Sequence, residues 1–355
     1  MDFDGILGIT REINASLSTF FELESQRLRS IGSELEPVAD ALGRFLLESG
    51  KRLRPLFAAI GFIGADGTLT PEIIRGVASL ELVHVCALIH DDVMDGSDTR
   101  RSAPSIHKQF EGIHRSTNLH GSSEQFGTAS AILLGDLTLV WAGKALHESA
   151  ISPELILRAL PIYDGMLVEL MAGQYLDIFE QALASESVER SLKVARYKSG
   201  KYSIERPLHF GASLAPKCSP EILKAYSEFG VPLGEAFQLR DDIIGVFGDP
   251  IKTGKPAGDD LREGKRTVLV ATTLSKCSPA QRQLFLSNFG QDDLNSDQID
   301  SLRQVILETG ALAEVENMID IMTFKAHEAL THGGITSGAV ALLNDLAVAA
   351  TQRIS

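Results

Sequence analysis

Helical periodicity constrains the fold of this chain more than any other feature of its sequence. Apolar residues recur at steps of three and four in EIIRGVASLELVHVCALIHDDVMD (72–95), ELILRALPIYDGMLVELMAGQYLDIFEQAL (154–183) and PEILKAYSEFGVPLGEAFQLRDDIIGVF (220–247). Runs of alternating, β-type residues are scarce, and no Pro-rich or Ser-rich linker divides the chain. The sequence therefore predicts one large all-α domain over residues 1–355. We expect kinks or breaks where Pro161 and Pro232 interrupt the apolar pattern.

Charge and cysteine usage exclude several classes of protein. The formal net charge of −14 argues against a surface for nucleic acid or anionic membranes. An uninterrupted apolar run of 18 residues is absent, and the acidic N-terminus does not resemble a signal peptide. The three cysteines, Cys86, Cys218 and Cys277, are isolated and lack metal-type spacing. We therefore expect a reduced cytoplasmic protein with no transmembrane segment.

The stretch HDDVMDGSDTRR (90–101) places an acid cluster at the end of a predicted helix. Asp91 and Asp95 are four residues apart, so they share a helical face, about 6 Å apart along the axis, whereas Asp92 points about 100° away. Three like charges at a helix C-terminus oppose the helix dipole and one another, so a cation must offset them. Carboxylates are preferred ligands of Mg²⁺, and the guanidinium groups of Arg100 and Arg101 suit phosphate oxygens. A solvated acidic helix end followed by a basic loop explains a single such motif equally well.

A second acid cluster favours the interpretation as a metal site over that of a solvated helix end. In RDDIIGVFGDPIKTGK (240–255), Asp241 and Asp242 again end a long apolar helical pattern and again precede basic residues. Two acid helix ends, each with basic residues nearby, are typical of a site for metal-bridged polyphosphate. Gly245 stands where the first cluster has its third aspartate.

Six blocks in a fixed order resemble the trans-isoprenyl diphosphate synthases of the polyprenyl synthetase family, most of all bacterial geranylgeranyl diphosphate synthases. The blocks, within residues 50–267, are GKRLRP, HDDVMDGSDTRR, GQYLD, YKSGKYS, FQLRDDIIGVFGD and TGKPAGDDLREGKRT. The resemblance implies an all-α bundle around a deep central cavity, usually in a homodimer. It also implies head-to-tail condensation of isopentenyl diphosphate with an allylic diphosphate (dimethylallyl, geranyl or farnesyl).

The resemblance further implies roles for individual residues. Three Mg²⁺ ions on the allylic diphosphate would be held by Asp91, Asp92 and Asp95, with Asp241 and Asp242 across the cavity. The same diphosphate would be contacted by Arg100, Lys198, Lys255 and Lys265. Isopentenyl diphosphate would be held by Lys51, Arg54, His84 and Arg101. The developing carbocation or the diphosphate would be stabilised by Gln174, Ser199, Gln238 and the ring of Phe237.

Ordinary structural roles remain open for several of these residues. A lone histidine on an apolar helix, such as His84, is more often a hydrogen-bonded core residue. Gln174, Ser199 and Gln238 would also suit hydrogen bonding at a helix surface, and Phe237 would suit packing. At Gly245 the family pattern has an aspartate. If the leading aspartates hold the metal, this position acts only through water and glycine is tolerated. Asp249 is a candidate substitute if the helix continues past Gly248.

The length of the product is predicted from residues before the first acid cluster. The family places an aromatic residue there to stop growth at farnesyl, but residues 77–90 contain no Phe, Tyr or Trp. Cys86 and Ala87 are small and lie about 6 to 8 Å below Asp91 along the helix. We therefore expect geranylgeranyl diphosphate as the main product. A farnesyl or longer product stays open, because another helix, for instance through Trp141, could form the floor.

Two other functions are compatible with a helical fold of this kind. A weakly catalytic partner subunit would be expected to lose acid clusters or diphosphate lysines, and this chain keeps both. A terpene cyclase would carry an Asn/Ser/Glu motif as its second metal site and would lack GKRLRP. The sequence therefore favours a synthase.

Overall fold

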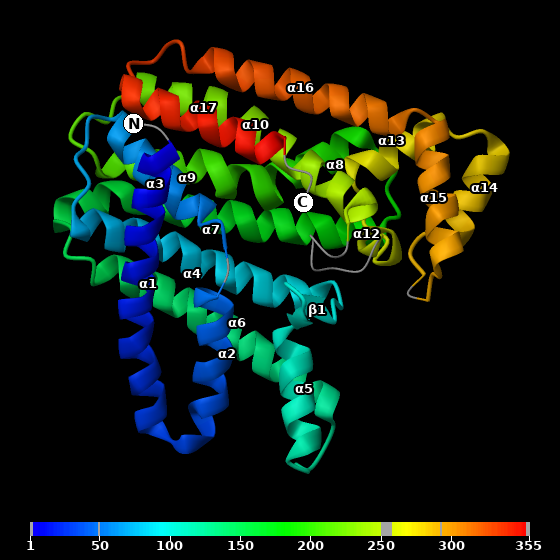
Figure 1. The fold of residues 1–355 in the computed structure, drawn as a ribbon, viewed down its shortest axis with the longest axis horizontal. Coiled ribbons are helices and arrows are strands. Elements are labelled where there is room, and N and C mark those ends of the chain that lie inside the picture. The colour runs from blue at the N-terminus through cyan, green and yellow to red at the C-terminus, as the bar shows by residue number, and fades with distance from the viewer. Residues whose placement is uncertain (1–2, 49, 250–257, 292, 353–355) are drawn as a thin grey trace. The chain divides into compact units, whose positions relative to one another are not determined.

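The structure is a computed structural model that describes residues 3–48, 50–249, 258–291 and 293–352 (Figure 1). It contains two compact units, Met1–Ala159 with Gly211–Lys217 and Leu160–Phe210 with Cys218–Ser355. We call them the first and the second unit. The predicted all-α fold is confirmed, since the only strands within the described residues are two of two residues each. The single domain stays a prediction.

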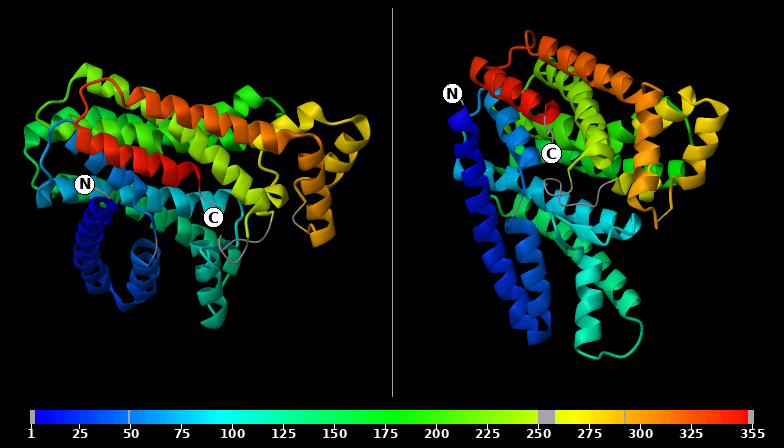
Figure 2. Two further views of the ribbon diagram at one scale, coloured as in Figure 1. Left: turned by 45° about the horizontal axis from the view of Figure 1, so that its top comes forward. Right: turned by 45° about the vertical axis from the view of Figure 1, so that its right-hand side comes forward.

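The first unit contains most of the N-terminal half of the chain. Its elements are α1 (Phe3–Ile31), η1 (Ser33–Leu35), α2 (Glu36–Leu47), α3 (Leu53–Gly64), α4 (Pro71–Met94), β1 (Thr99–Arg100), β2 (Ala103–Pro104), α5 (Ile106–Ser116), α6 (Ser123–His147) and the start of α7 (Pro153–Ala182). In both views of Figure 2, α1 and α2 run side by side in opposite directions. Helix α4 packs mainly against α6, and also against α1 and α3.

The second unit contains the rest of α7 and most of the C-terminal half. Its elements are α8 (Val188–Val194), η2 (Ala195–Glu205), most of α9 (Arg206–Leu214), α10 (Pro220–Phe247), α12 (Asp259–Arg262), α13 (Val268–Lys276), α14 (Pro279–Asn288), α15 (Ser296–Glu308), α16 (Ala311–Ala329) and α17 (Ser337–Thr351). Helix α10 packs against α16 and against η2, which is a π-helix. Short π-helical segments often mark functional sites.

Helices α4 and α10, which carry the two acid clusters, begin in the same way. The Thr70 hydroxyl accepts from the backbone N–H of Ile73 at 3.5 Å, and the Ser219 hydroxyl accepts from that of Ile222 at 3.3 Å. In each case a proline follows the cap, where its missing N–H costs nothing. Helix α4 ends at Met94, and α10 ends at Phe247. Local sequence therefore fixes where each acid cluster falls, at the last turns of a mostly buried helix.

Of the kinks or breaks expected at two prolines, the breaks are wrong and the kinks stay a prediction. Helix α7 runs through Pro161, and α10 runs through Pro232. On either side of Pro232, Phe229 and Leu233 are fully buried. This apolar packing outweighs the backbone hydrogen bond that the proline removes.

Two helices, α4 and α6, are long and apolar enough to cross a membrane by length and composition alone. Core helices of globular proteins pass the same test, and 72% of the most apolar stretch of α4 is buried. In α6 the share is 39%, and Ile132, Leu133 and Val140 are among its exposed residues. The absence of a transmembrane segment stays a prediction.

Candidate active site

The first acid cluster lies on the last turn of α4, with Asp95 as the C-terminal capping residue directly after Met94. The backbone N–H of Asp95 donates to the carbonyl of Asp91 at 2.8 Å, so the two share a helical face as predicted. Asp92 is only 1% exposed and points elsewhere, toward Arg100. The Nε of Arg100 donates to Oδ1 of Asp92 at 2.7 Å, and its Nη2 lies 3.6 Å from Oδ2 of Asp91. The cluster and its arginine thus form one connected charged group.

A tight hairpin places the arginines of the first cluster. Strands β1 and β2 pair Arg100 with Ala103, and Arg101 and Ser102 form the turn with φ values of 54° and 63°. Both residues therefore adopt the left-handed conformation that a two-residue hairpin of this kind requires. Side chains other than glycine, asparagine or aspartate rarely adopt it, and such strain concentrates at functional sites.

Opposing effects act on Arg100. Burial acts to lower the pKa of its guanidinium, but the charge of Asp92 and the hydrogen bond to it act the other way, as do the charges of Asp91 and Asp95. The net shift of the pKa is upward, so Arg100 stays charged.

Two of the residues predicted to hold isopentenyl diphosphate, Arg54 and Arg101, lie near a third, His84. Arg54 is buried in the first turn of α3, and Lys51 is exposed in the segment before it. Burial lowers the pKa of His84 well below its usual value, and nearby guanidinium groups lower it further. In order of effect, these groups belong to Arg54, Arg101, Arg100 and Arg52. His84 is therefore neutral near pH 7 and lies in a strongly positive environment.

Arg52, in the same GKRLRP block, has a structural role that the sequence did not indicate. Its Nη1 donates to Oε1 of Glu81 at 2.8 Å, and both side chains are at most 3% exposed. Its Nε donates to Asn14 at 2.8 Å and its Nη2 to the carbonyl of Leu46 at 2.7 Å. Arg52 thereby ties α1, α2 and α4 together.

The second acid cluster lies near the end of α10. Asp242 is buried and accepts a hydrogen bond from Nε2 of Gln238 at 2.7 Å, whereas Asp241 is half-buried. Burial raises the pKa of Asp242 well above its usual value, and the charges of Asp260 and Asp241 raise it further, against the effects of Gln238 and Lys265. Burial and the two neighbouring carboxylates therefore disfavour the charged form of Asp242.

Gly245 leaves space for a carboxylate from elsewhere in the chain. A Cβ atom at Gly245 would lie 1.9 Å from Oδ2 of Asp260, a residue of α12. Asp260 also lies 3.4 Å from Nζ of Lys265, which contacts Glu263 at 2.6 Å. Asp249, the replacement considered from sequence, lies exposed beyond the end of α10, so it does not share the helix with Asp241. From here the second acid cluster means Asp241, Asp242 and Asp260.

Several other predicted residues lie on η2 and α7. Nζ of Lys198 donates to Oδ2 of Asp177, the aspartate of the GQYLD block, at 2.6 Å. Ser199 and Gln174 are half-buried, and Phe237 on α10 is 8% exposed. Lys255 lies outside the described residues. The sequence offered a signal for Asp177 and Asp260, since both stand in the quoted blocks.

The two residues predicted to set product length point in different directions. Ala87 is four residues before Asp91, about 40° around the helix, and is half-buried. Cys86 lies about 140° around the helix axis from Asp91. Its Sγ lies 3.7 Å from Nδ1 of His90. Burial and the charge of Asp136 raise the pKa of Cys86 to about 12, so the thiol stays protonated.

His90 in turn packs closely against α6. Its Nε2 lies 3.1 Å from the carbonyl oxygen of Ile132, and a Cβ atom at Gly135 would lie 2.1 Å from that nitrogen. Cys86 therefore belongs to the contact between α4 and α6, whereas Ala87 faces the side of α4 that carries Asp91.

The donor chemistry of the acid clusters fits magnesium. Within the described part of the chain, no three or more His, Cys, Asp and Glu side chains form a self-contained metal cage. Mg²⁺ rarely needs one, because one or two carboxylates and substrate phosphates commonly hold it. Asp91 and Asp95 offer two such carboxylates on one helical face, and the charges of Asp241 and Asp260 both act on the carboxyl group of Asp242.

Comparison with known proteins decides the family. A model of the polyprenyl synthetase family matches residues 36–306. The chain belongs to the polyprenyl synthetase family. The predicted class of enzyme is confirmed: the chain is a prenyltransferase of the kind that elongates prenyl chains head to tail.

Several named proteins are similar to this polyprenyl synthetase. A crystal structure of geranylgeranyl pyrophosphate synthase from Corynebacterium glutamicum, complexed with isoprenyl diphosphate and magnesium, is 40% identical with a TM-score of 0.93, covering 99% of this chain and 100% of that one. Geranylfarnesyl diphosphate synthase from Aeropyrum pernix is 32% identical over 79% of this chain and 83% of the relative. (2E,6E)-farnesyl diphosphate synthase from Mycobacterium bovis is 30% identical over 84% and 81%. Three product lengths thus occur among similar proteins.

Proposed function

We propose that this polyprenyl synthetase condenses isopentenyl diphosphate with allylic diphosphates in a Mg²⁺-dependent reaction, with geranylgeranyl diphosphate as the main product. One observation carries the proposal: Asp91 and Asp95 share a helical face beside Arg100, and Arg54, Arg101 and neutral His84 lie in the same unit. Carboxylates for a metal and guanidinium groups for a second diphosphate therefore occur together.

We assign the acid clusters to Mg²⁺ on the allylic diphosphate. Asp91 and Asp95 would hold metal directly, and Asp92 would orient Arg100 toward the same phosphates through their 2.7 Å hydrogen bond. Asp241, Asp242 and Asp260 would hold metal on the second unit, for three ions in all. When bound, the metal would neutralise the diphosphate as its bond to the allylic carbon breaks.

The basic residues would divide between the two substrates. Lys51, Arg54, His84 and Arg101 would bind isopentenyl diphosphate, with His84 as a neutral hydrogen-bonding group. The allylic diphosphate would be bound by Arg100, Lys198, Lys255 and Lys265. Lys198 would exchange part of its contact with Asp177 for a phosphate oxygen. A compact ammonium on a flexible stem suits that exchange.

The remaining assigned residues act on the hydrocarbon part of the reaction. Loss of diphosphate leaves a positive charge on the allyl group, which an apolar, water-excluding surface protects. Gln174, Ser199 and Gln238 would orient their oxygen dipoles toward that charge, and Phe237 would offer its ring face. The isopentenyl double bond then attacks and a proton leaves to the departing diphosphate, so this scheme needs no nucleophilic side chain.

A direct assay tests the proposed function. The purified protein is incubated with Mg²⁺, isopentenyl diphosphate and dimethylallyl, geranyl or farnesyl diphosphate, and the products are sized by mass spectrometry. We expect a twenty-carbon product from all three primers and none with EDTA. Allylic diphosphate consumed without isopentenyl diphosphate would favour a cyclase, and no turnover would favour a partner subunit.

Product length gives a prediction about the two faces of α4. Ala87→Phe is expected to shorten the main product to farnesyl diphosphate, because Ala87 faces the side of Asp91. Cys86→Phe should instead press on His90 and α6, so it should lower the melting temperature more than it changes the product. Product sizing and thermal unfolding of both variants check this. Shortening by Cys86→Phe alone would place the chain-length floor on the α6 side.

The exposed apolar side chains of α6 favour a homodimer. Leu133 and Val140 are each 66% exposed and Ile132 is 45% exposed on one helix. Contiguous exposed apolar residues commonly mark a protein interface. We propose that this face meets a second copy, and we keep a cytoplasmic location as a prediction.

A further inference from the structure

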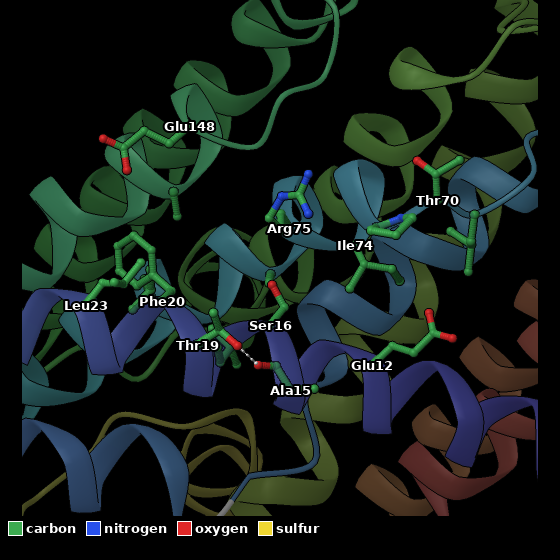
Figure 3. Close-up of a pocket in the computed structure, with 16 residues that line it drawn as sticks. Glu12, Ala15, Ser16, Thr19, Phe20, Leu23, Thr70, Ile74, Arg75 and Glu148 are labelled. Carbon is green, nitrogen blue, oxygen red and sulfur yellow. Dashed lines mark hydrogen bonds between the residues drawn. The ribbon is translucent and has the colours of Figure 1, made fainter.

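A pocket of about 530 Å³ lies in the first unit, between α1, the N-terminal half of α4 and the C-terminal end of α6 (Figure 3). Its volume falls within the range of roughly 300 to 1,000 Å³ that is typical of small-molecule sites. None of the residues assigned to the reaction lines it.

The pocket lies on the side of α4 that faces away from the first acid cluster. Ile74, Ala78 and Leu82 line it at four-residue steps, so they share a face of the helix. Leu82 is nine residues before Asp91, so it lies about 180° around the helix axis from Asp91. His84 lies only about 20° around the axis from Asp91. A molecule in this pocket would therefore contact the back of the helix that carries the first acid cluster.

The interior of the pocket is apolar and its mouth is open. Leu17, Ala78 and Leu82 are each at most 3% exposed and form buried wall. Phe20 also lines the pocket, and Leu23 lies 56% exposed at its edge. Such a surface suits a single hydrocarbon chain that enters from solvent.

The charged groups at the pocket decide whether a positively or a negatively charged ligand is favoured. Figure 3 draws Glu12 and Glu148 at opposite ends, with Arg75 between them. The guanidinium of Arg75 already contacts Oε1 of Glu72 at 3.0 Å and the carbonyl oxygen of Ser149 at 3.1 Å. Its charge is therefore offset, and the rim is negative.

A lysine near this rim offsets the charge of Glu148 only in part. Nζ of Lys144 lies 2.7 Å from Oε1 of Glu24 and 3.9 Å from Glu148. Its closer partner is thus a carboxylate outside the lining, and Glu148 itself is exposed.

We propose that this pocket binds an amphiphile with one apolar chain and a basic head group, at a site separate from the reaction. The apolar wall takes the chain, and Glu12 or Glu148 pairs with the head. An anionic head, including the diphosphate of the enzyme's own substrates and products, meets carboxylates there and is disfavoured.

The fluorescence of Trp141, the one tryptophan of the sequence, reports ligand binding in the pocket. Trp141 stands in a T-shaped contact with Phe20, their ring centroids 6.2 Å apart, so occupancy of the pocket should alter its fluorescence. Dodecylamine, dodecanol and dodecyl phosphate, titrated below their micelle concentrations, share a chain and differ in head group. We expect the amine to bind roughly five- to tenfold more tightly than the phosphate, from charge alone.

Two matched variants on α1 locate the binding. Ser16 lines the pocket and Ser18 is exposed outside it, so Ser16→Phe should weaken amine binding about tenfold or more while Ser18→Phe leaves it unchanged. Glu12→Gln combined with Glu148→Gln should remove the preference for the amine. Calorimetry repeats each titration without relying on fluorescence.

Three results would overturn the proposal: tighter binding of the phosphate, equal effects of the two serine variants, or displacement of the amine by saturating Mg²⁺ and geranylgeranyl diphosphate. The last result would mean that the pocket connects with the substrate site. Activity of the wild-type protein is measured in parallel, so failure of the pocket proposal is distinguishable from failure of the proposed function.

Discussion

Asp91→Ala is expected to lower turnover by roughly 10²- to 10³-fold while the helical fold stays intact. The side chain is half-buried on the last turn of α4 and shares a face with Asp95, so its removal takes away a proposed metal ligand and little packing. Asp241→Ala is expected to cost a similar factor at the second acid cluster. Turnover under saturating Mg²⁺ and both substrates measures the effect, and circular dichroism checks the fold.

Asp98 provides a matched control for Asp91. It lies in the same segment, its side chain is 72% exposed, and it contacts Lys108 at 3.2 Å. Asp98→Ala should therefore keep turnover within about twofold, because exposed ion pairs contribute little. Near-normal turnover of Asp91→Ala or of Asp241→Ala would contradict the assignment of both clusters to metal.

Local sequence was enough to predict the parts of the site that lie within one helix. The caps at Thr70 and Ser219 and the apolar spacing after them decide where α4 and α10 run. The positions of Asp91 and Asp95 follow from that helix by spacing alone. The breaks expected at Pro161 and Pro232 were wrong because the sequence alone does not show how tightly the helix around a proline packs against its neighbours.

Contacts between distant segments were beyond what one sequence reveals. Arg52 and Arg54 stand two residues apart in GKRLRP, yet Arg52 enters a buried ion pair with Glu81, 29 residues later. The pairing of Lys198 with Asp177 and the apolar pocket along α1 likewise depend on which helices meet. Helical spacing could favour Asp249 as the substitute at Gly245. It could not show that Asp260 of α12 lies beside Gly245.

Exchanging two residues is expected to show that Asp260 replaces the aspartate missing at Gly245. Gly245→Asp alone should lower turnover about tenfold or more, because any Cβ there would lie 1.9 Å from Oδ2 of Asp260 and displace that carboxylate. Asp260→Gly alone should cost at least as much through lost negative charge beside Asp242. The double variant, with aspartate at 245 and glycine at 260, should recover to within a few-fold of wild type.

Metal binding separates this compensation from a merely steric effect. Mn²⁺ titration followed by electron paramagnetic resonance, with an unreactive allylic diphosphate analogue present, should show weaker binding for each single variant and recovery for the double variant. Gly245→Ala introduces the clash without a charge and should resemble Asp260→Gly. Asp249→Ala, which removes the exposed carboxylate beyond α10, should bind Mn²⁺ as the wild type does. If the double variant stays as weak as the worse single variant, Asp260 has a structural role and the second acid cluster consists of Asp241 and Asp242 alone.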